Sequence, residues 1–291
     1  MLRERIVTDQ RYGAVVVRLW RPRDASVPAP FLFRSRRFAR TLPRGIFAGV
    51  STEPNDRLTL RVLGAVSLAG REGAEALLAQ PKRAALLIYL AAARPNGHHR
   101  RDRLVSMFWP EHDQDHARAA LRKALYAIRQ TLGDDVIVAR GDEEVAVSDS
   151  VWCDSTEFRA FATKERFAAA LELYHGDFLD GFFADAPGFE RWVEEERGHC
   201  RELAGTCAWT LAERYASSAD LTSATRWARR AVNLAPSDER RLRKALTLLL
   251  QAGDRAGAVR LFEDFARRLR ADLDVDPSVE TLNLVKQIRE R

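Results

Sequence analysis

The feature that most constrains the fold is a repeat in the second half of the chain. The pattern is Ala219-Asp220, Ala224, Ala228 and Ala231, and it recurs 34 positions later as Gly253-Asp254, Ala258, Phe262 and Phe265. A period of 34 residues is typical of tetratricopeptide repeats, in which each helix pair buries its apolar face by stacking on the next pair. Residues 151–291 are therefore predicted to form an all-α, tetratricopeptide-like helical repeat domain.

The region before the repeat alternates between strand and helix patterns. Short β-prone runs come first, at 58–63 and 66–68. Helical patterns follow at 81–93, 100–109 and 113–132, and two further β-prone runs, at 136–138 and 145–147, flank a turn that contains Gly141. Strands, three helices and a hairpin are the elements of a winged helix-turn-helix (α+β). We therefore expect an α-rich protein of two domains, a winged-helix DNA-binding domain over 58–150 followed by the helical repeat domain.

Residues 1–57 differ in composition from both domains. They carry 12 Lys and Arg against 5 Asp and Glu, and prolines at 22, 28, 30, 43 and 54 interrupt any periodic pattern. We expect a basic, disordered N-terminal tail. Three interpretations of it stay open: a solvated linker, an additional arm that contacts phosphates, or a start codon assigned too far upstream.

Charge and cysteine content restrict where the protein acts. The net charge is +6, and most of the basic excess lies in the N-terminal half, which suits a polyanionic partner such as double-stranded DNA. The three cysteines form no CxxC pair, which favours a reducing compartment. No apolar run approaches the length of a membrane span. We expect a cytoplasmic protein that does not bind a membrane.

The helix predicted over 113–132 has the pattern of a DNA recognition helix. Leucine and isoleucine residues fall within an arc of roughly 60° at about 100° per residue, at positions 121, 125, 128 and 132. The neighbouring arc holds Arg118, Arg122, Tyr126 and Arg129. The first face would pack on the domain while the second meets base edges and phosphates in the major groove. Lys123 is a candidate phosphate contact and Arg140, at the hairpin tip, a candidate wing contact; the alternative is an ordinary solvated helix.

The sequence offers little support for catalysis. It contains no GxxxxGK[ST], GxGxxG or GxSxG motif. His112 and His116 have the i, i+4 spacing of zinc proteases, but Asp113 replaces the general-base glutamate and no third ligand is recognisable. His98 and His99 lie in a turn and are expected to face solvent. We predict that the protein is not an enzyme and holds neither a cofactor nor a metal.

Several motifs resemble a known family. The runs that resemble the OmpR-type winged helix of the Streptomyces antibiotic regulatory protein (SARP) family are Leu60–Gly64, Lys82–Leu90, Arg103-Leu104, Phe108–Pro110 and Ala117–Gly133. The runs that are similar to that family's bacterial transcriptional activation domain (BTAD) are Ala170–Leu179, Trp192–Arg197, Ala252–Ala258 and Leu273–Thr281. The tail over 1–57 has no counterpart in the family.

The resemblance implies a bacterial transcriptional activator. Such a protein binds direct-repeat promoter DNA as a pair of protomers and recruits RNA polymerase. Carried over to this sequence, residues 113–132 form the recognition helix, and the preceding loop faces the polymerase through Trp109, Glu111, His112 and Asp113. A second hypothesis is a tetratricopeptide-type interaction scaffold whose winged helix no longer binds DNA, because residues 58–147 carry only 13 basic against 11 acidic residues.

Overall fold

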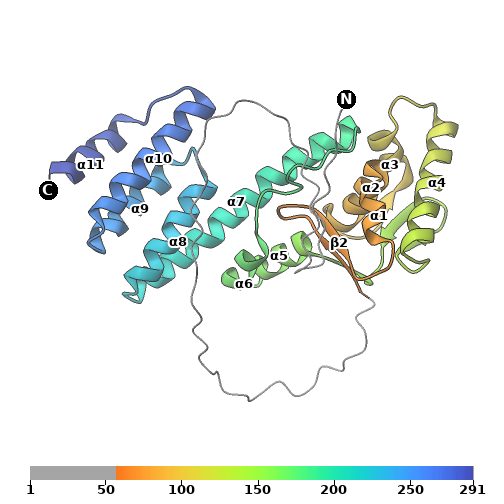
Figure 1. Cartoon of the computed structure of the whole chain (residues 1–291), viewed down its shortest axis with the longest axis horizontal. Helices are drawn as coiled ribbons and strands as arrows, with labels where there is room; N and C mark the ends of the chain where they lie inside the picture. The colour runs from red at the N-terminus through yellow and green to blue at the C-terminus, as the bar shows by residue number, and fades with distance from the viewer. Residues whose placement is uncertain (1–56, 291) are drawn as a thin grey trace, which may run out of the picture. The chain divides into compact units, whose positions relative to one another are not determined.

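The computed structural model describes residues 57–290, so the tail predicted over 1–57 lies, apart from Arg57, outside the described residues. The strands are β1 (Leu58–Arg61), β2 (Ser67–Ala69), β3 (His99–Arg100), β4 (Ile137–Arg140), β5 (Glu144–Val147) and β6 (Val151–Cys153). The helices are α1 (Ala74–Leu78), α2 (Pro81–Ala92), α3 (Arg101–Phe108), α4 (Gln114–Leu132), α5 (Asp154–Thr163), α6 (Phe167–Leu173), α7 (Pro187–Ser217), α8 (Leu221–Leu234), α9 (Glu239–Gln251), α10 (Arg255–Leu273) and α11 (Val279–Glu290). Figure 1 shows the small sheets on the N-terminal side and the long run of helices that follows.

Two small sheets frame the helices of the winged-helix region. In the first, β1 pairs antiparallel with β2 and parallel with β6. In the second, β5 lies between β3 and β4, and the β4–β5 hairpin turns at Gly141, whose φ is 59°. The helices predicted at 81–93, 100–109 and 113–132 and the hairpin are all present, within a few residues of their expected bounds. The sequence patterns missed α1, β3 and β6, which are each five residues or shorter.

Helix α4 begins and ends where its sequence dictates. The side chain of Asp113 accepts a hydrogen bond from the His116 amide at 3.0 Å, which satisfies one of the free N–H groups of the first turn. At the other end Gly133 has a φ of 108°, a conformation that favours glycine and stops the helix. The four apolar residues predicted to pack, at positions 121, 125, 128 and 132, are all buried. This fixes which face of α4 is left for solvent.

The 34-residue repeat corresponds to a shared way of starting two helices. Asp220 caps α8 by accepting from the Ser223 amide, and Asp254 caps α10 by accepting from the Gly257 amide. Ala224 and Ala258, one turn further on, are fully buried. Consecutive helices from α7 to α11 pack against one another, as expected for a helical repeat (Figure 1).

The cap at α10 makes a testable contribution to stability. Asp254→Ala removes both the cap on the Gly257 amide and the ion pair with Arg229, so we expect the free energy of unfolding to fall by about 1–2 kcal/mol. Urea denaturation followed by circular dichroism measures this change. Asp264→Ala is the matched control, because among the described residues the Asp264 carboxylate pairs with the exposed Arg267 on the same helix and with no other side chain. Equal losses in the two variants would contradict a special role for the cap.

One hydrophobic core runs from the winged-helix region into the first helices that follow it. Aromatic rings connect the two: Tyr89 on α2 lies 4.8 Å from Trp192 on α7, and Phe108 on α3 lies 5.5 Å from Phe189 on α7, between ring centroids. The three cysteines are buried in this region as free thiols. A second cluster fills the space between helices α8 to α11. Within residues 57–290 no helix has the length and apolar character needed to cross a bilayer.

Candidate nucleic-acid interface

The solvent-facing side of α4 carries the residues predicted to read DNA. Arg122 and Lys123 are exposed, and Tyr126 is 64% exposed although it is aromatic. The Arg118 side chain is 46% exposed and contacts Asp102 of α3 at 3.1 Å. A tyrosine combines an apolar ring with a polar hydroxyl, and tyrosine is enriched at contact surfaces for this reason. The exposed face therefore combines positive charge with one aromatic ring.

This face forms one wall of a groove of about 640 Å³. The other walls come from the start of α3 and the turn of the β4–β5 hairpin. The lining residues are Arg100, Arg101, Asp102, Arg118, Leu121, Arg122, Leu125, Tyr126, Arg129, Asp142 and Glu143. Arginine predominates over carboxylates in this set, so the groove has a net positive charge.

Arg101 is a component of the groove that the sequence analysis missed. Its backbone N–H donates to the Glu143 carbonyl at 2.8 Å, which joins α3 to the hairpin, and its side-chain Nε is buried without a hydrogen-bond partner among the described residues. Burial lowers the pKa of Arg101, the positive charges of Arg129 and Arg122 lower it further, and the negative charge of Asp142 opposes them. Repulsion of this kind is relieved when an anion enters. The run His98-His99-Arg100-Arg101 was the available signal in the sequence.

The other residues predicted to contact DNA differ in whether their side chains are already bound to other groups of the protein. Arg129 is half-buried and donates to the Ile137 carbonyl at 3.1 Å, so it also holds the hairpin against α4. Arg140 is exposed at the hairpin and forms an ion pair with Glu144. Lys123 and Arg140 do not line the groove, whereas Arg118, Arg122, Tyr126 and Arg129 do.

The loop between α3 and α4 presents polar side chains. Glu111, His112 and Asp113 are exposed, and His112 Nδ1 lies 3.1 Å from a Glu111 carboxylate oxygen. The His116 amide and ring lower the pKa of the Asp113 carboxyl by hydrogen bonding to it. Trp109 is only 8% exposed, with its ring 5.9 Å from Phe108. The accessible part of this loop is therefore acidic and polar rather than aromatic.

His99 was expected to face solvent, and that expectation is wrong. It is 5% exposed and its ring lies 5.2 Å from that of Tyr89. The reason is that His99 belongs to β3, which pairs with β5 and turns this side chain toward the core. Burial lowers its pKa, as does the nearby charge of Arg103. Among residues 57–290 no group of three or more His, Cys, Asp or Glu side chains could hold a metal ion.

The C-terminal end of α4 is held by Arg71. Its guanidinium donates to the Leu132 carbonyl at 2.6 Å and to both carboxylate oxygens of Asp135 at 2.7 Å. These contacts lower the pKa of Asp135 to about 2. The ion pair connects the loop after β2 with the end of the helix that lines the groove.

The ion pair between Arg71 and Asp135 should be visible in the acid titration of the Asp135 carboxyl. The stabilisation by Asp135 is fully present above its unfolded pKa of about 3.9 and is lost as the pH falls through about 2. In Arg71→Ala the carboxyl pKa should return to about 4. NMR titration of the Asp135 carboxyl carbon measures both values. A midpoint near 4 in the unaltered protein would contradict the contact.

The helical half of the chain matches a known protein family. Residues 156–289 match the bacterial transcriptional activator domain. The second half of the chain therefore contains the activator domain that its sequence motifs resemble. The resemblance drawn from the sequence motifs is thereby confirmed. No curated protein sequence is significantly similar to this chain.

A solved structure is similar to most of the described fold. It is Mycobacterium tuberculosis EmbR in complex with a low affinity phosphopeptide, with a TM-score of 0.55 and 20% sequence identity. The match covers 80% of this chain and 65% of that chain, so this chain spans slightly less than two thirds of the length of EmbR. The similarity confirms the predicted fold class of an α-rich chain with a winged helix followed by a helical domain.

Proposed function

We propose that this SARP-type protein is a transcriptional activator that binds direct-repeat promoter DNA as a pair of protomers and recruits RNA polymerase. The observation that carries the proposal is the arginine-lined groove beside the exposed face of α4. In this proposal residues 58–150 are the DNA-binding domain and residues 151–291 the activation domain. The protein acts in the cytoplasm, where promoter DNA is accessible.

The groove supports DNA as the ligand through both charge and shape. The B-DNA major groove, about 12 Å wide, admits a single α-helix, and arginine pairs with guanine edges or phosphates. Arg118, Arg122 and Tyr126 project from the face of α4 that its buried leucines leave exposed. Arg101 adds a positive charge, and its Nε has no hydrogen-bond partner among the described residues. Although Asp142 attracts that charge, such a group suits a phosphate.

The loop between α3 and α4 supports the proposed contact with polymerase. Glu111, His112 and Asp113 are exposed next to the N-terminus of α4. These three side chains offer charge and hydrogen-bonding groups to a protein partner while α4 lies in the major groove of the DNA. The buried Trp109 would act by holding the loop rather than by touching the polymerase.

Selection of genomic DNA fragments by the purified protein, at about 150 mM salt, tests the proposal, because non-specific phosphate binding is weak there. We expect enrichment of sites with two repeats, one helical turn or a multiple of it apart. The affinity for an enriched site should fall with salt, with a log–log slope of about −0.9 for each phosphate neutralised. A folded protein that enriches no motif would contradict DNA recognition.

A second candidate is a protein-interaction scaffold that does not bind DNA. It is favoured by the partial neutralisation of the groove, because Arg118 contacts Asp102, and Asp142 and Glu143 also line it. Capture of a stable protein partner by the unaltered chain, together with no enriched DNA motif, would support this function instead.

A further inference from the structure

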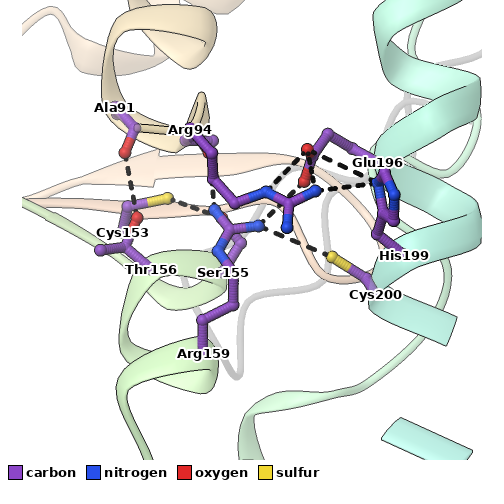
Figure 2. Close-up of polar contacts among 10 residues, drawn as sticks. Ala91, Arg94, Cys153, Ser155, Thr156, Arg159, Glu196, His199 and Cys200 are labelled. Atoms are coloured by element: carbon purple, nitrogen blue, oxygen red, sulfur yellow. Dashed lines mark hydrogen bonds and ion pairs between the residues drawn. The ribbon is translucent and has the colours of Figure 1, made fainter. Parts of the chain in front are cut away.

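A buried carboxylate on α7 connects the DNA-binding half to the helical half. We call the Glu196 cluster the set of side chains around it: Arg94, Arg159, Glu196 and His199. Figure 2 shows the guanidinium groups of Arg94 and Arg159 both pointing toward Glu196. The Glu196 side chain is 5% exposed; Arg94 Nη2 lies 2.9 Å from Oε1 and Arg159 Nη1 lies 3.0 Å from Oε2. Arg94 Nη2 also lies 2.8 Å from His199 Nδ1.

The residues of the cluster come from three separate elements. Arg94 follows the end of α2 in the winged-helix region, Arg159 lies on α5, and Glu196 lies on α7. The same contacts cap the end of α2: Arg159 Nη2 donates to the Ala92 carbonyl at 2.6 Å, and Thr156 Oγ1 donates to the Ala91 carbonyl at 3.0 Å. The last carbonyls of an α-helix have no partner within the helix. Helical residues outside the winged helix therefore fix where α2 ends.

The apolar contacts between the halves are of a different kind. Tyr89 packs against Trp192 in an edge-to-face arrangement, and the preference of such a ring pair for one geometry is modest, about 0.5–1.5 kcal/mol. A buried carboxylate shared by two guanidinium groups has few acceptable geometries. Such buried ion pairs add little net stability, but in some proteins they specify one arrangement over others. Because α2 packs against α4, an arrangement that fixes α2 also fixes the exposed face of α4.

We propose that Glu196 is a positioning residue for DNA binding, which holds α2, and with it α4, in one orientation relative to α7. This inference rests on the proposed function, because two protomers side by side on direct repeats can select a repeat spacing only if each DNA-reading face has a fixed orientation. Glu196 does not line the groove, so its role is indirect. Without the cluster, α4 keeps its DNA-contacting side chains, but the helix is no longer held in one orientation relative to α7.

The first test requires no DNA. Spin labels are placed on the full chain at Gln130→Cys on α4 and Thr222→Cys on α8, both exposed, while the native cysteines are buried. Pulsed electron paramagnetic resonance measures the distance between the two labels. The distribution of this distance should be narrow in the labelled protein that retains Glu196 and broader in the labelled Glu196→Gln variant. Arg94→Ala is the second variant in case Glu196→Gln does not fold, because the Arg94 side chain is 44% exposed and Arg159 still neutralises Glu196.

Arg214→Ala is the matched control for these variants. It removes an α7 ion pair with Glu165 that lies wholly within the helical half. Its distance distribution should stay narrow. An unchanged distribution in both Glu196→Gln and Arg94→Ala, or equal broadening in the control, would overturn the proposal.

The second test uses the selected DNA sites. We expect Arg94→Ala to bind a single repeat as the unaltered protein does, whereas its preference for the natural spacing of two repeats should fall about tenfold or more. A parallel loss of single-repeat and two-repeat affinity would indicate a merely structural role, and an unchanged spacing preference would also overturn the proposal. If the unaltered protein selects no DNA, the proposed function fails, and the distance measurement alone still decides whether Glu196 fixes the orientation.

Discussion

The double variant Arg118→Ala/Arg122→Ala is expected to bind a selected promoter site about 100-fold more weakly than the unaltered protein at about 150 mM salt, since an arginine that reads a base contributes about 1–3 kcal/mol. Both side chains line the groove and are exposed on α4. The fold should be unchanged, because within residues 57–290 the Arg118 guanidinium pairs with Asp102, which is itself exposed, and surface ion pairs add little stability. Fluorescence anisotropy with labelled DNA measures the affinity.

The control for this variant is Arg260→Ala/Arg267→Ala on α10. It removes the same charge from exposed positions that do not line the groove. Its affinity for the promoter site should stay within about twofold of the unaltered protein, because the distant charges are screened. Promoter binding that survives the α4 substitutions would show that the site assignment is wrong. Equal loss in the control would mean that overall charge, and not the groove, attracts DNA.

Periodicity was sufficient to predict α4 and its two faces, because both depend only on residues close in sequence. The role of Arg101 was not predictable in this way. It becomes part of the groove because its backbone N–H bonds to Glu143, 42 positions later, and this pairing depends on the tertiary fold. The same applies to Arg129, whose bond to the Ile137 carbonyl requires the hairpin to fold back over the helix. Local patterns identify which residues share a helix face, but not which of them are already held by other groups.

The first sheet shows a similar limit for the fold. Residues 58–61 were recognisable as a strand, but their parallel partner β6 is three residues long and comes roughly 90 positions later. β6 begins one residue after the expected end of the winged-helix domain. Asp154 follows β6 and is the first residue of α5, a position where an acidic side chain is usually exposed. In this structure it is fully buried. An acidic side chain becomes acceptable in a core only when donors from another segment reach it, which a local pattern does not contain.

Asp154→Ala is expected to lower the free energy of unfolding by about 3–5 kcal/mol, since each buried donor left without a partner costs about 1–3 kcal/mol. The Asp154 carboxylate accepts the backbone N–H of Val62 at 2.9 Å and that of Leu63 at 3.1 Å. Burial raises the pKa of this carboxyl, against the lowering effect of the two donors. Alanine leaves both N–H groups buried beside the end of β1. Urea denaturation of the full chain measures the loss.

Two further variants make this result specific to the carboxylate. Asp154→Asn retains one acceptor oxygen for two donors, so its loss of stability should lie between those of the unaltered protein and Asp154→Ala. Asp149→Ala makes the same change at an exposed position in the preceding turn and should alter stability by less than about 0.5 kcal/mol. If Asp154→Ala were as stable as Asp149→Ala, the bonds to Val62 and Leu63 would not be what joins α5 to the first sheet. If Asp154→Ala is the least stable variant, as expected, then the Asp154 side chain of the helical half is required for the stability of the DNA-binding half.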